Sequence, residues 1–283
     1  MAIVQTSVSS AKSIAQVDPV WSRIRDEAER IAHDEPALAG FLFATVINHT
    51  RLEDAICHRL AQRLSHPDVD ASLLSNTFES VLETVPTMGE LFRSDIVAVY
   101  DRDPACHRFI DALLYFKGFH AIQTHRFAHE LFKANRKDFA FYLQSQASRV
   151  FSIDIHPGAR VGRGVFVDHG HAIVVGETAR IGNDVSMLHG VTLGGTGKDS
   201  EDRHPKIADG VLIGAGAKIL GNILVGECAR VAAGSVVLEP VPAKTTVAGV
   251  PAKIVGEAGC SEPSRTMNHM LQDAVDREND GAS

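Results

Sequence analysis

The sequence predicts an α+β protein, in which an N-terminal α-helical bundle is followed by a parallel β-helix of hexapeptide repeats. The first observation is a period of six: from Ile155 to Val237 an apolar side chain recurs at every sixth residue, apart from two interruptions. That period fits neither a helix nor a simple strand, and it is typical of solenoids built from short strands and turns. The second observation is the helical amphipathic pattern of residues 19–150.

Residues 19–150 are expected to form a compact bundle of short helices joined by short loops. Pro104 suits the first turn of one helix and Asp103 its N-cap, because that carboxylate can accept from free backbone N–H groups. The stretches with helical spacing are 21–31, 52–64, 71–85, 88–99, 104–116, 118–132 and 138–150.

Residues 151–256 are expected to form the β-helix. Three hexads close one triangular coil of about 18 residues, and the apolar anchors of successive coils stack inside it. The anchors are Ile155, Val161, Val167, Val175, Ile181, Met187, Leu193, Ile207, Ile213, Ile219, Val225, Val231 and Val237.

The repeat is interrupted twice, and both interruptions are rich in titratable groups. Two extra residues precede Val175 and eight precede Ile207. The first insertion carries Asp-His-Gly-His at 168–171, and the second ends in Asp-Arg-His-Pro-Lys at 202–206. Because the stacked core cannot absorb extra residues, both insertions must bulge outward, where solenoids often bind their ligands.

The composition is that of a soluble globular protein of 283 residues, with 45% hydrophobic and 22% charged residues. The net charge of −7 argues against a nucleic-acid-binding protein, which usually carries a basic balance or stripe. No apolar run approaches the roughly 18 residues that cross a bilayer, so no membrane segment is expected.

Residues 1–18 are expected to form a disordered tail without the features of a secretory signal, and residues 257–283 a flexible C-terminal tail. The cysteine spacing indicates neither a disulfide framework nor a zinc knuckle. We therefore expect reduced thiols and a cytoplasmic protein. The cysteines are Cys57, Cys106, Cys228 and Cys260.

The insertions hold the groups that acyl transfer to a small hydroxyl or amine requires. A neutral alcohol is a poor nucleophile, so a base must take its proton, and His169 is the candidate. Asp154 lies almost one coil earlier, so that stacking could bring it close enough to orient this imidazole. Backbone N–H groups at Gly194-Gly195 could stabilise the oxyanion, and Arg203 suits a substrate carboxylate.

Other interpretations stay open from the residues alone. His169 could be a solvated loop residue, and Asp154 could only cap a turn. A zinc site is a second chemistry, although no ligand-spacing motif stands out and no metal is expected. Acyl transfer to a sugar or an amine, or a scaffold without activity, are further alternatives. The histidines near the insertions are His156, His169, His171, His189 and His204.

Several motifs point to a known family. The helical region contains Asp-Arg-Asp-Pro-Ala at 101–105 and Tyr-Phe-Lys-Gly-Phe at 115–119. The repeats contain Asp-Ile-His-Pro at 154–157, Gly-Val-Phe-Val-Asp-His at 164–169 and Val-Val-Gly-Glu-Thr-Ala at 174–179. Further on are Val-Thr-Leu-Gly-Gly-Thr-Gly-Lys at 191–198, Asp-Arg-His-Pro-Lys-Ile at 202–207 and Ala-Gly-Val-Pro-Ala at 248–252. Over about residues 21–256 the chain resembles the serine acetyltransferases, a family of left-handed β-helix enzymes.

The resemblance implies an acyltransferase that moves the acetyl group of acetyl-CoA to the hydroxyl of L-serine. The products would be O-acetyl-L-serine and CoA, in the first step of cysteine biosynthesis, with inhibition by L-cysteine. Homoserine is an acceptor that residue chemistry alone does not distinguish from serine. The family also implies a homotrimer or a homohexamer, a dimer of trimers joined through the helical domains.

The resemblance also implies a role for each matching residue. His169 would be the general base, with Asp154 as its orienting partner. The substrate ammonium would lie against Asp103 and Asp168, and its carboxylate against Arg203 and His204. The Gly195 backbone would meet the thioester oxygen. The groove for acetyl-CoA, between neighbouring subunits, would be lined by Gly195, Ala215, Ala233 and Lys253.

One feature departs from the family pattern. Members commonly end in Ile, which inserts into the active site of O-acetylserine sulfhydrylase, whereas this sequence ends in Ser283. Because a Ser terminus lacks the apolar anchor, a complex with that enzyme is doubtful here.

Overall fold

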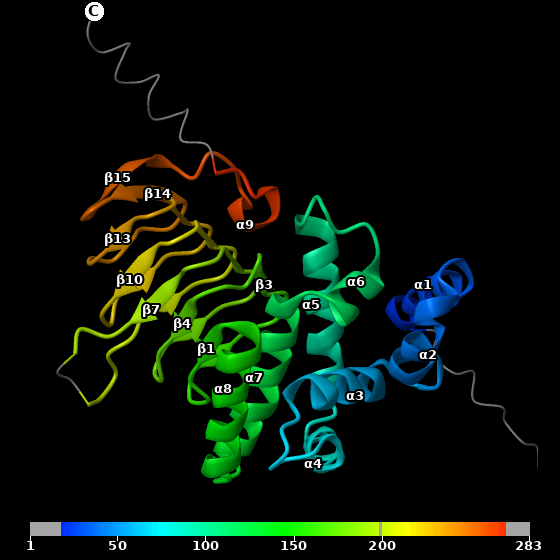
Figure 1. Ribbon diagram of the computed structural model, residues 1–283. Helices are drawn as coiled ribbons and strands as arrows, with labels where there is room; N and C mark the ends of the chain where they lie inside the picture. Colours follow the sequence, from blue (N-terminus) through cyan, green and yellow to red (C-terminus); the bar gives the residue numbers. More distant parts are fainter. Residues whose placement is uncertain (1–17, 198–199, 270–283) are drawn as a thin grey trace, which may run out of the picture.

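The computed structural model describes residues 18–197 and 200–269. A bundle of helices lies at one end of a parallel β-helix (Figure 1). Most of the expected N-terminal tail, and Ser283 with its neighbours, lie outside the described residues. The helices are α1 (Pro19–Asp34), α2 (Ala39–Leu42), α3 (Leu52–Leu64), α4 (Ala71–Thr84), α5 (Met88–Arg102), α6 (Phe109–Leu114), α7 (Lys117–Lys133) and α8 (Lys137–Phe151), with a 3-10 turn at Pro36–Leu38 and a π turn at Phe43–Ile47.

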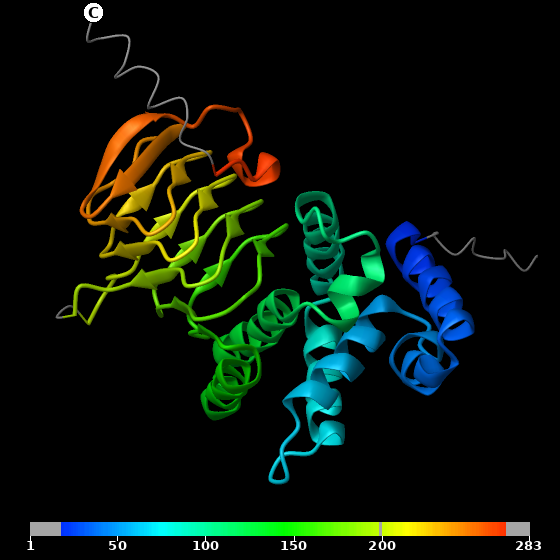
Figure 2. The ribbon, with the colours of Figure 1, turned by 45° about the horizontal axis from the view of Figure 1, so that its top comes forward.

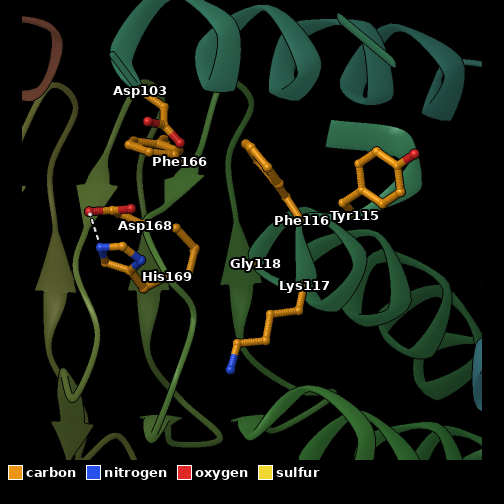
Figure 3. A pocket seen from close by; sticks show the side chains of 9 residues that line it. Asp103, Tyr115, Phe116, Lys117, Gly118, Phe166, Asp168 and His169 are labelled. Carbon is orange, nitrogen blue, oxygen red and sulfur yellow. Dashed lines mark ion pairs between the residues drawn. The ribbon is translucent and has the colours of Figure 1, made fainter. Parts of the chain in front are cut away.

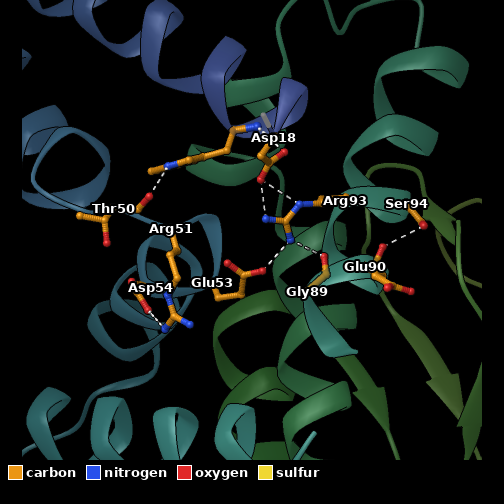
Figure 4. A network of polar contacts seen from close by, with 10 residues as sticks. Asp18, Thr50, Arg51, Glu53, Asp54, Gly89, Glu90, Arg93 and Ser94 are labelled. Carbon is orange, nitrogen blue, oxygen red and sulfur yellow. Dashed lines mark hydrogen bonds and ion pairs between the residues drawn. The ribbon is translucent and has the colours of Figure 1, made fainter. Parts of the chain in front are cut away.

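Arg93 of α5 joins three helices of the bundle (Figure 4). Its guanidinium donates to the Asp18 carboxylate at 2.9 Å, to Glu53 at 2.6 Å and to the Gly89 carbonyl at 2.7 Å. Asp18 is also the N-cap of α1, since its Oδ1 accepts from the Trp21 amide at 3.1 Å. The starts of α1 and α3 are therefore fixed on α5.

The prediction of a helix over 104–116 was wrong about its start. Asp103 follows the last residue of α5, and α6 begins only at Phe109. The cap of α6 comes from another helix, because the Ile110 amide donates to the buried carboxylate of Glu27 at 2.9 Å. A contact between distant residues thus decides where α6 begins, and no local pattern in the sequence contains it.

The β-helix has three faces whose strands pair in parallel, except that the last pair, β14–β15, is antiparallel; the strands recur in the same order in each coil (Figure 2). The strands are β1 (Ile153–Ile155), β2 (Arg160–Val161), β3 (Phe166–Val167), β4 (Ile173–Val175), β5 (Arg180–Ile181), β6 (Ser186–Met187), β7 (Thr192–Gly194), β8 (Lys206–Ile207), β9 (Leu212–Ile213), β10 (Lys218–Leu220), β11 (Leu224–Val225), β12 (Arg230–Val231) and β13 (Val236–Val237), followed by β14 (Thr245–Gly249) and β15 (Ala252–Glu257). The sheets have the orders β1-β4-β7-β10-β13, β2-β5-β8-β11 and β3-β6-β9-β12-β14-β15.

The predicted anchors stack on one another. On the first face Val175 pairs with Leu193, Leu193 with Ile219 and Ile219 with Val237. Every anchor is buried except Val161 in the first coil, which is partly buried. Because burying each such side chain contributes roughly 1.5–3 kcal/mol, the column supplies a continuous core through the coils.

A buried ion pair connects the bundle to the first coil. Arg126 of α7 donates to Asp95 of α5 at 2.7 Å, and both side chains are almost fully buried. The same guanidinium donates to the Gly162 carbonyl at 2.7 Å, and the other oxygen of Asp95 accepts from the Val165 amide at 3.0 Å. Both charged groups thus have several hydrogen-bond partners, as a buried ion pair requires.

The chain after β15 returns to the bundle. A short helix, α9 (Pro263–Thr266), contacts α5 and β9. The hydroxyl of Ser186 donates to the Ser264 carbonyl at 2.7 Å and accepts from Arg102 of α5 at 3.1 Å. The segment Pro263–Thr266, within the expected flexible tail, is therefore packed against the other two parts of the fold.

Candidate active site

Two of the three edges of the β-helix carry the predicted site residues. The edge formed by residues 168–172, 188–191, 214–217 and 232–235, after β3, β6, β9 and β12, is here named the His169 edge. The edge formed by residues 176–179, 195–197, 200–205 and 221–223, after β4, β7 and β10, is named the His204 edge. Both sequence insertions lie at edges, as predicted, and the second projects from the solenoid (Figure 1).

The His169 edge and the helical bundle line an open cavity of about 280 Å³. Two carboxylates, one imidazole and one ammonium line it together with three aromatic rings (Figure 3). A cavity with apolar walls and a few convergent polar groups is typical of a small-molecule site. Its lining residues are Asp103, Tyr115, Phe116, Lys117, Gly118, Phe166, Val167, Asp168 and His169.

The first insertion forms a tight bulge that carries His169. His169 and Ala172 have φ of 55° and 54°, left-handed values that residues other than glycine seldom adopt. The bulge packs closely on the start of α7, since a Cβ on Gly170 would lie 3.0 Å from the Gly118 Cα. Strain held in place by packing is common at functional sites.

Two acidic groups line the same cavity as the imidazole. His169 Nε2 lies 3.8 Å from Asp168 Oδ2, with side chains 75% and 22% exposed. Asp103, which lines the cavity, accepts from the Ala105 amide at 2.8 Å in an Asx turn. Asp103 and Asp168 together make this cavity a favourable place for a cation.

Asp154 is not paired with His169 in this structure. Its Oδ1 instead accepts from Gln144 of α8 at 2.6 Å. Asp154 pairs with Val174 in the β1–β4 ladder. The bulge nevertheless lies against β1, because a Cβ on Gly170 would be 2.8 Å from the Ile153 side chain.

The His204 edge holds the guanidinium and the second imidazole. Arg203 donates to Glu177 at 2.8 Å. His204 is 7% exposed, and its Nδ1 accepts from the Thr178 amide at 3.2 Å. Burial lowers the pKa of His204, and the positive charges of Arg203 and Lys206 lower it further. His204 is therefore neutral near pH 7, with its proton on Nε2.

The structure thus separates the residues that the sequence grouped into one site. Asp103, Asp168 and His169 line the cavity of the His169 edge, whereas Arg203 and His204 lie at the other edge and do not line it. The β1-β4-β7-β10-β13 sheet lies between the two edges.

The residues expected to line the acetyl-CoA groove are divided in the same way. Ala215 and Ala233 lie on the His169 edge, one coil apart, where the Gly234 amide donates to the Ala215 carbonyl at 2.7 Å. Gly195 begins the loop on the His204 edge, and Lys253 is exposed on β15.

Sequence reasoning gave no role to Glu177 and Thr178, the partners of Arg203 and His204. The sequence does contain a signal for these contacts, because Glu177 precedes Arg203, and Thr178 precedes His204, by 26 residues. That separation equals one coil of about 18 residues plus the insertion, so stacking brings these residues together.

Neither a metal cluster nor a membrane helix is found in the described part of the chain. Within residues 18–197 and 200–269 no three His, Cys, Asp or Glu side chains are grouped so that they could hold a metal ion. No helix in the same ranges is both long and apolar enough to span a bilayer.

Comparison with known proteins places the chain in a family. Residues 20–124 match the family model "Serine acetyltransferase, N-terminal", and residues 204–239 match "Bacterial transferase hexapeptide (six repeats)". The serine acetyltransferase of Haemophilus influenzae is 51% identical over 249 residues, which are 88% of this chain and 93% of that protein.

Solved structures similar to this chain also belong to serine acetyltransferases. The serine acetyltransferase of Brucella abortus strain S19 in complex with coenzyme A is 61% identical, with a TM-score of 0.85 over 88% of this chain and 99% of that one. A serine acetyltransferase in complex with cysteine is 50% identical, with a TM-score of 0.87 over 89% and 98%. The predicted fold class, a helical region followed by a left-handed β-helix, is confirmed. By sequence and by structure, this chain belongs to the serine acetyltransferase family.

Proposed function

We propose that the protein transfers the acetyl group of acetyl-CoA to the hydroxyl of L-serine, giving O-acetyl-L-serine and CoA. The observation that carries the proposal is the cavity in which Asp103 and Asp168 lie beside His169. Its size suits a small amino acid, and its two carboxylates suit an ammonium group better than an uncharged sugar. The structure of a relative with coenzyme A supports the donor.

In this reaction His169 is the general base. It takes the proton of the serine hydroxyl as the oxygen attacks the thioester carbon. When the carbon–sulfur bond breaks, the imidazolium gives this proton to the sulfur, so that CoA leaves as the thiol. Backbone N–H at Gly195 stabilises the negative charge on the thioester oxygen. Ala215, Ala233 and Lys253 contact CoA.

Asp154 is proposed to orient His169 when substrate is bound. Support comes from the position of β1 against the bulge and from the large exposure of the His169 side chain. A carboxylate on the far imidazole nitrogen would fix the tautomer and stabilise the imidazolium that forms.

The complete site requires a second copy of the chain. Arg203 and His204, which are proposed to bind the serine carboxylate, are separated from His169 by one face of the solenoid, on the order of 15 Å or about five extended residues. A three-fold arrangement would set the His204 edge of one subunit against the His169 edge of the next, and such a heterologous contact closes at three. Exposed apolar Val174 on that face, 44% exposed, supports a covering partner.

We further propose a dimer of such trimers, joined through the helical bundles, where Phe43 and Leu73 expose apolar side chains. A hexamer would sediment with six times the chain mass of 30.5 kDa, and a trimer with three times that mass. A monomer at assay concentrations that still turns over serine would overturn the shared site.

L-Cysteine is proposed to inhibit by occupying the serine site. It keeps the ammonium and carboxylate of serine and replaces the hydroxyl with a thiol. The structure of a relative with cysteine supports this. A cytoplasmic location is proposed as well, because the four cysteines are free thiols.

Thiol release from acetyl-CoA tests the function. L-Serine is compared with L-homoserine, a galactoside and no acceptor, and the arm with L-cysteine is followed by thioester absorbance. Release with L-serine alone, suppressed by L-cysteine, is expected. Release that is equal without acceptor, or faster with homoserine, would refute the proposed acceptor.

A further inference from the structure

We propose that Thr178 is the positioning residue that holds Arg203 and His204 in place for the substrate carboxylate. This inference rests on the proposed function, in which those two side chains bind the carboxylate. Thr178 lies on the His204 edge, one coil before the pair.

Each polar atom of Thr178 bonds to the end of the long insertion. Its hydroxyl oxygen accepts from the Arg203 amide and from the His204 amide, both at 3.1 Å. Its own amide donates to His204 Nδ1 at 3.2 Å, and its carbonyl accepts from Lys206 at 2.9 Å. These hydrogen bonds hold the last residues of the long insertion against the preceding coil.

These bonds set the chemical state of His204 as well as its place. An amide N–H can only donate, so His204 Nδ1 must be the acceptor and the proton must lie on Nε2. The Thr178 hydroxyl also lies 2.9 Å from Nδ1. His204 consequently presents Nε2–H as a donor, which is what a carboxylate oxygen requires.

Gly176 provides the room for this ring. A Cβ there would lie 1.9 Å from His204 Nε2, so no other residue type leaves the imidazole where it is. Glu177 holds the Arg203 guanidinium from the same turn. Gly176, Glu177 and Thr178 thus form a three-residue cradle, and the Thr178 hydroxyl alone contacts the backbone of both binding residues.

Thr178→Val tests the inference, because valine keeps the shape and removes the hydroxyl. The KM for L-serine should rise about tenfold, since losing roughly 1.4 kcal/mol of binding corresponds to a factor of ten. The KM for acetyl-CoA and kcat should change less than about twofold, because the loss is confined to carboxylate binding. Thr178→Ser, which retains the hydroxyl, should restore the KM for serine.

Three further arms make the result specific. Thr84→Val, at a hydroxyl on α4 that bonds only to carbonyls of its own helix, is the matched control and should have no effect. In a background that carries both Arg203→Ala and His204→Ala, Thr178→Val should add less than about twofold, because both side chains that Thr178 holds are then absent. Thr178→Ala replaces the valine variant if the latter does not fold.

An unchanged serine KM, equal losses toward serine and acetyl-CoA, or a further full loss from Thr178→Val in the background lacking both Arg203 and His204 would each overturn the role of Thr178. These outcomes are distinct from failure of the proposed function itself, in which the unmodified protein would release no thiol with L-serine.

Discussion

Gly118, at the start of α7, touches the end of β3: a Cβ at this position would lie 2.2 Å from the carbonyl oxygen of Val167. The helical bundle therefore meets the β-helix directly behind the bulge that carries Asp168 and His169. The contact lets two parts of the chain, some fifty residues apart, form one cavity.

Gly118→Ala should lower both stability and turnover, because the added methyl group would clash with the Val167 backbone, which cannot move aside as a flexible side chain can. We expect about 1–3 kcal/mol loss of unfolding free energy and a lower kcat/KM for serine. Gly40→Ala is the matched control, since nothing lies within 4 Å of its would-be Cβ. Thermal unfolding and thiol release measure both effects, and a fully active, stable Gly118→Ala variant would contradict the close contact.

His169→Ala should lower kcat about 10²- to 10⁴-fold without changing the oligomer mass, because it removes the proposed base. His171→Ala, in the same bulge, is the control and should retain most activity. Steady-state kinetics and light scattering give the two readouts. Turnover within a few-fold of the unmodified protein would exclude His169 as the base.

Arg203→Ala should chiefly raise the KM for L-serine, because it removes a charged partner of the carboxylate. Glu177→Gln should have a smaller effect in the same direction, since Glu177 only holds the guanidinium at 2.8 Å. Initial rates at varied serine and fixed acetyl-CoA distinguish the two variants. An unaltered serine dependence in Arg203→Ala would mean that the carboxylate binds elsewhere.

Arg126→Ala should strongly destabilise the fold, by about 3–5 kcal/mol, because it leaves the Asp95 carboxylate buried and unpaired. Lys133→Ala, which breaks an exposed pair with Glu130, should cost less than about 0.5 kcal/mol. Urea unfolding of both variants gives the comparison. If Arg126→Ala and Lys133→Ala had the same free energy of unfolding, burial would not be the reason that the Asp95–Arg126 pair stabilises the fold.

Acid should destabilise the protein partly through His120. Burial lowers its pKa to about 3, whereas an unfolded histidine has a pKa near 6.5. Below a pH of about 6.5, His120 binds a proton in the unfolded chain but stays neutral in the folded chain. The contribution of the neutral, buried His120 to the free energy of unfolding is therefore complete above that pH and is lost progressively toward pH 3. His120→Gln should reduce the slope by up to about 1.4 kcal/mol per pH unit, whereas His33→Gln, at a ring 87% exposed, should not. Urea unfolding at several pH values between 4.5 and 7.5 measures the slopes, and identical slopes would exclude His120.

The sequence by itself determined the β-helix and the places where it is interrupted. Hexapeptide periodicity is a local property, because each anchor must point into the coil and the next anchor follows after one strand and one turn. The stacking of Val175 on Leu193 and of Leu193 on Ile219 follows from counting residues. The same counting would have paired Thr178 with His204, across one coil and one insertion.

The tertiary structure alone decided two other features. The start of α6 depends on Glu27 from α1, and Asp154 is engaged by Gln144 rather than by His169. Neither relation can be counted from the repeat. They depend on which faces pack together, and packing is a property of the whole fold rather than of any short segment of sequence.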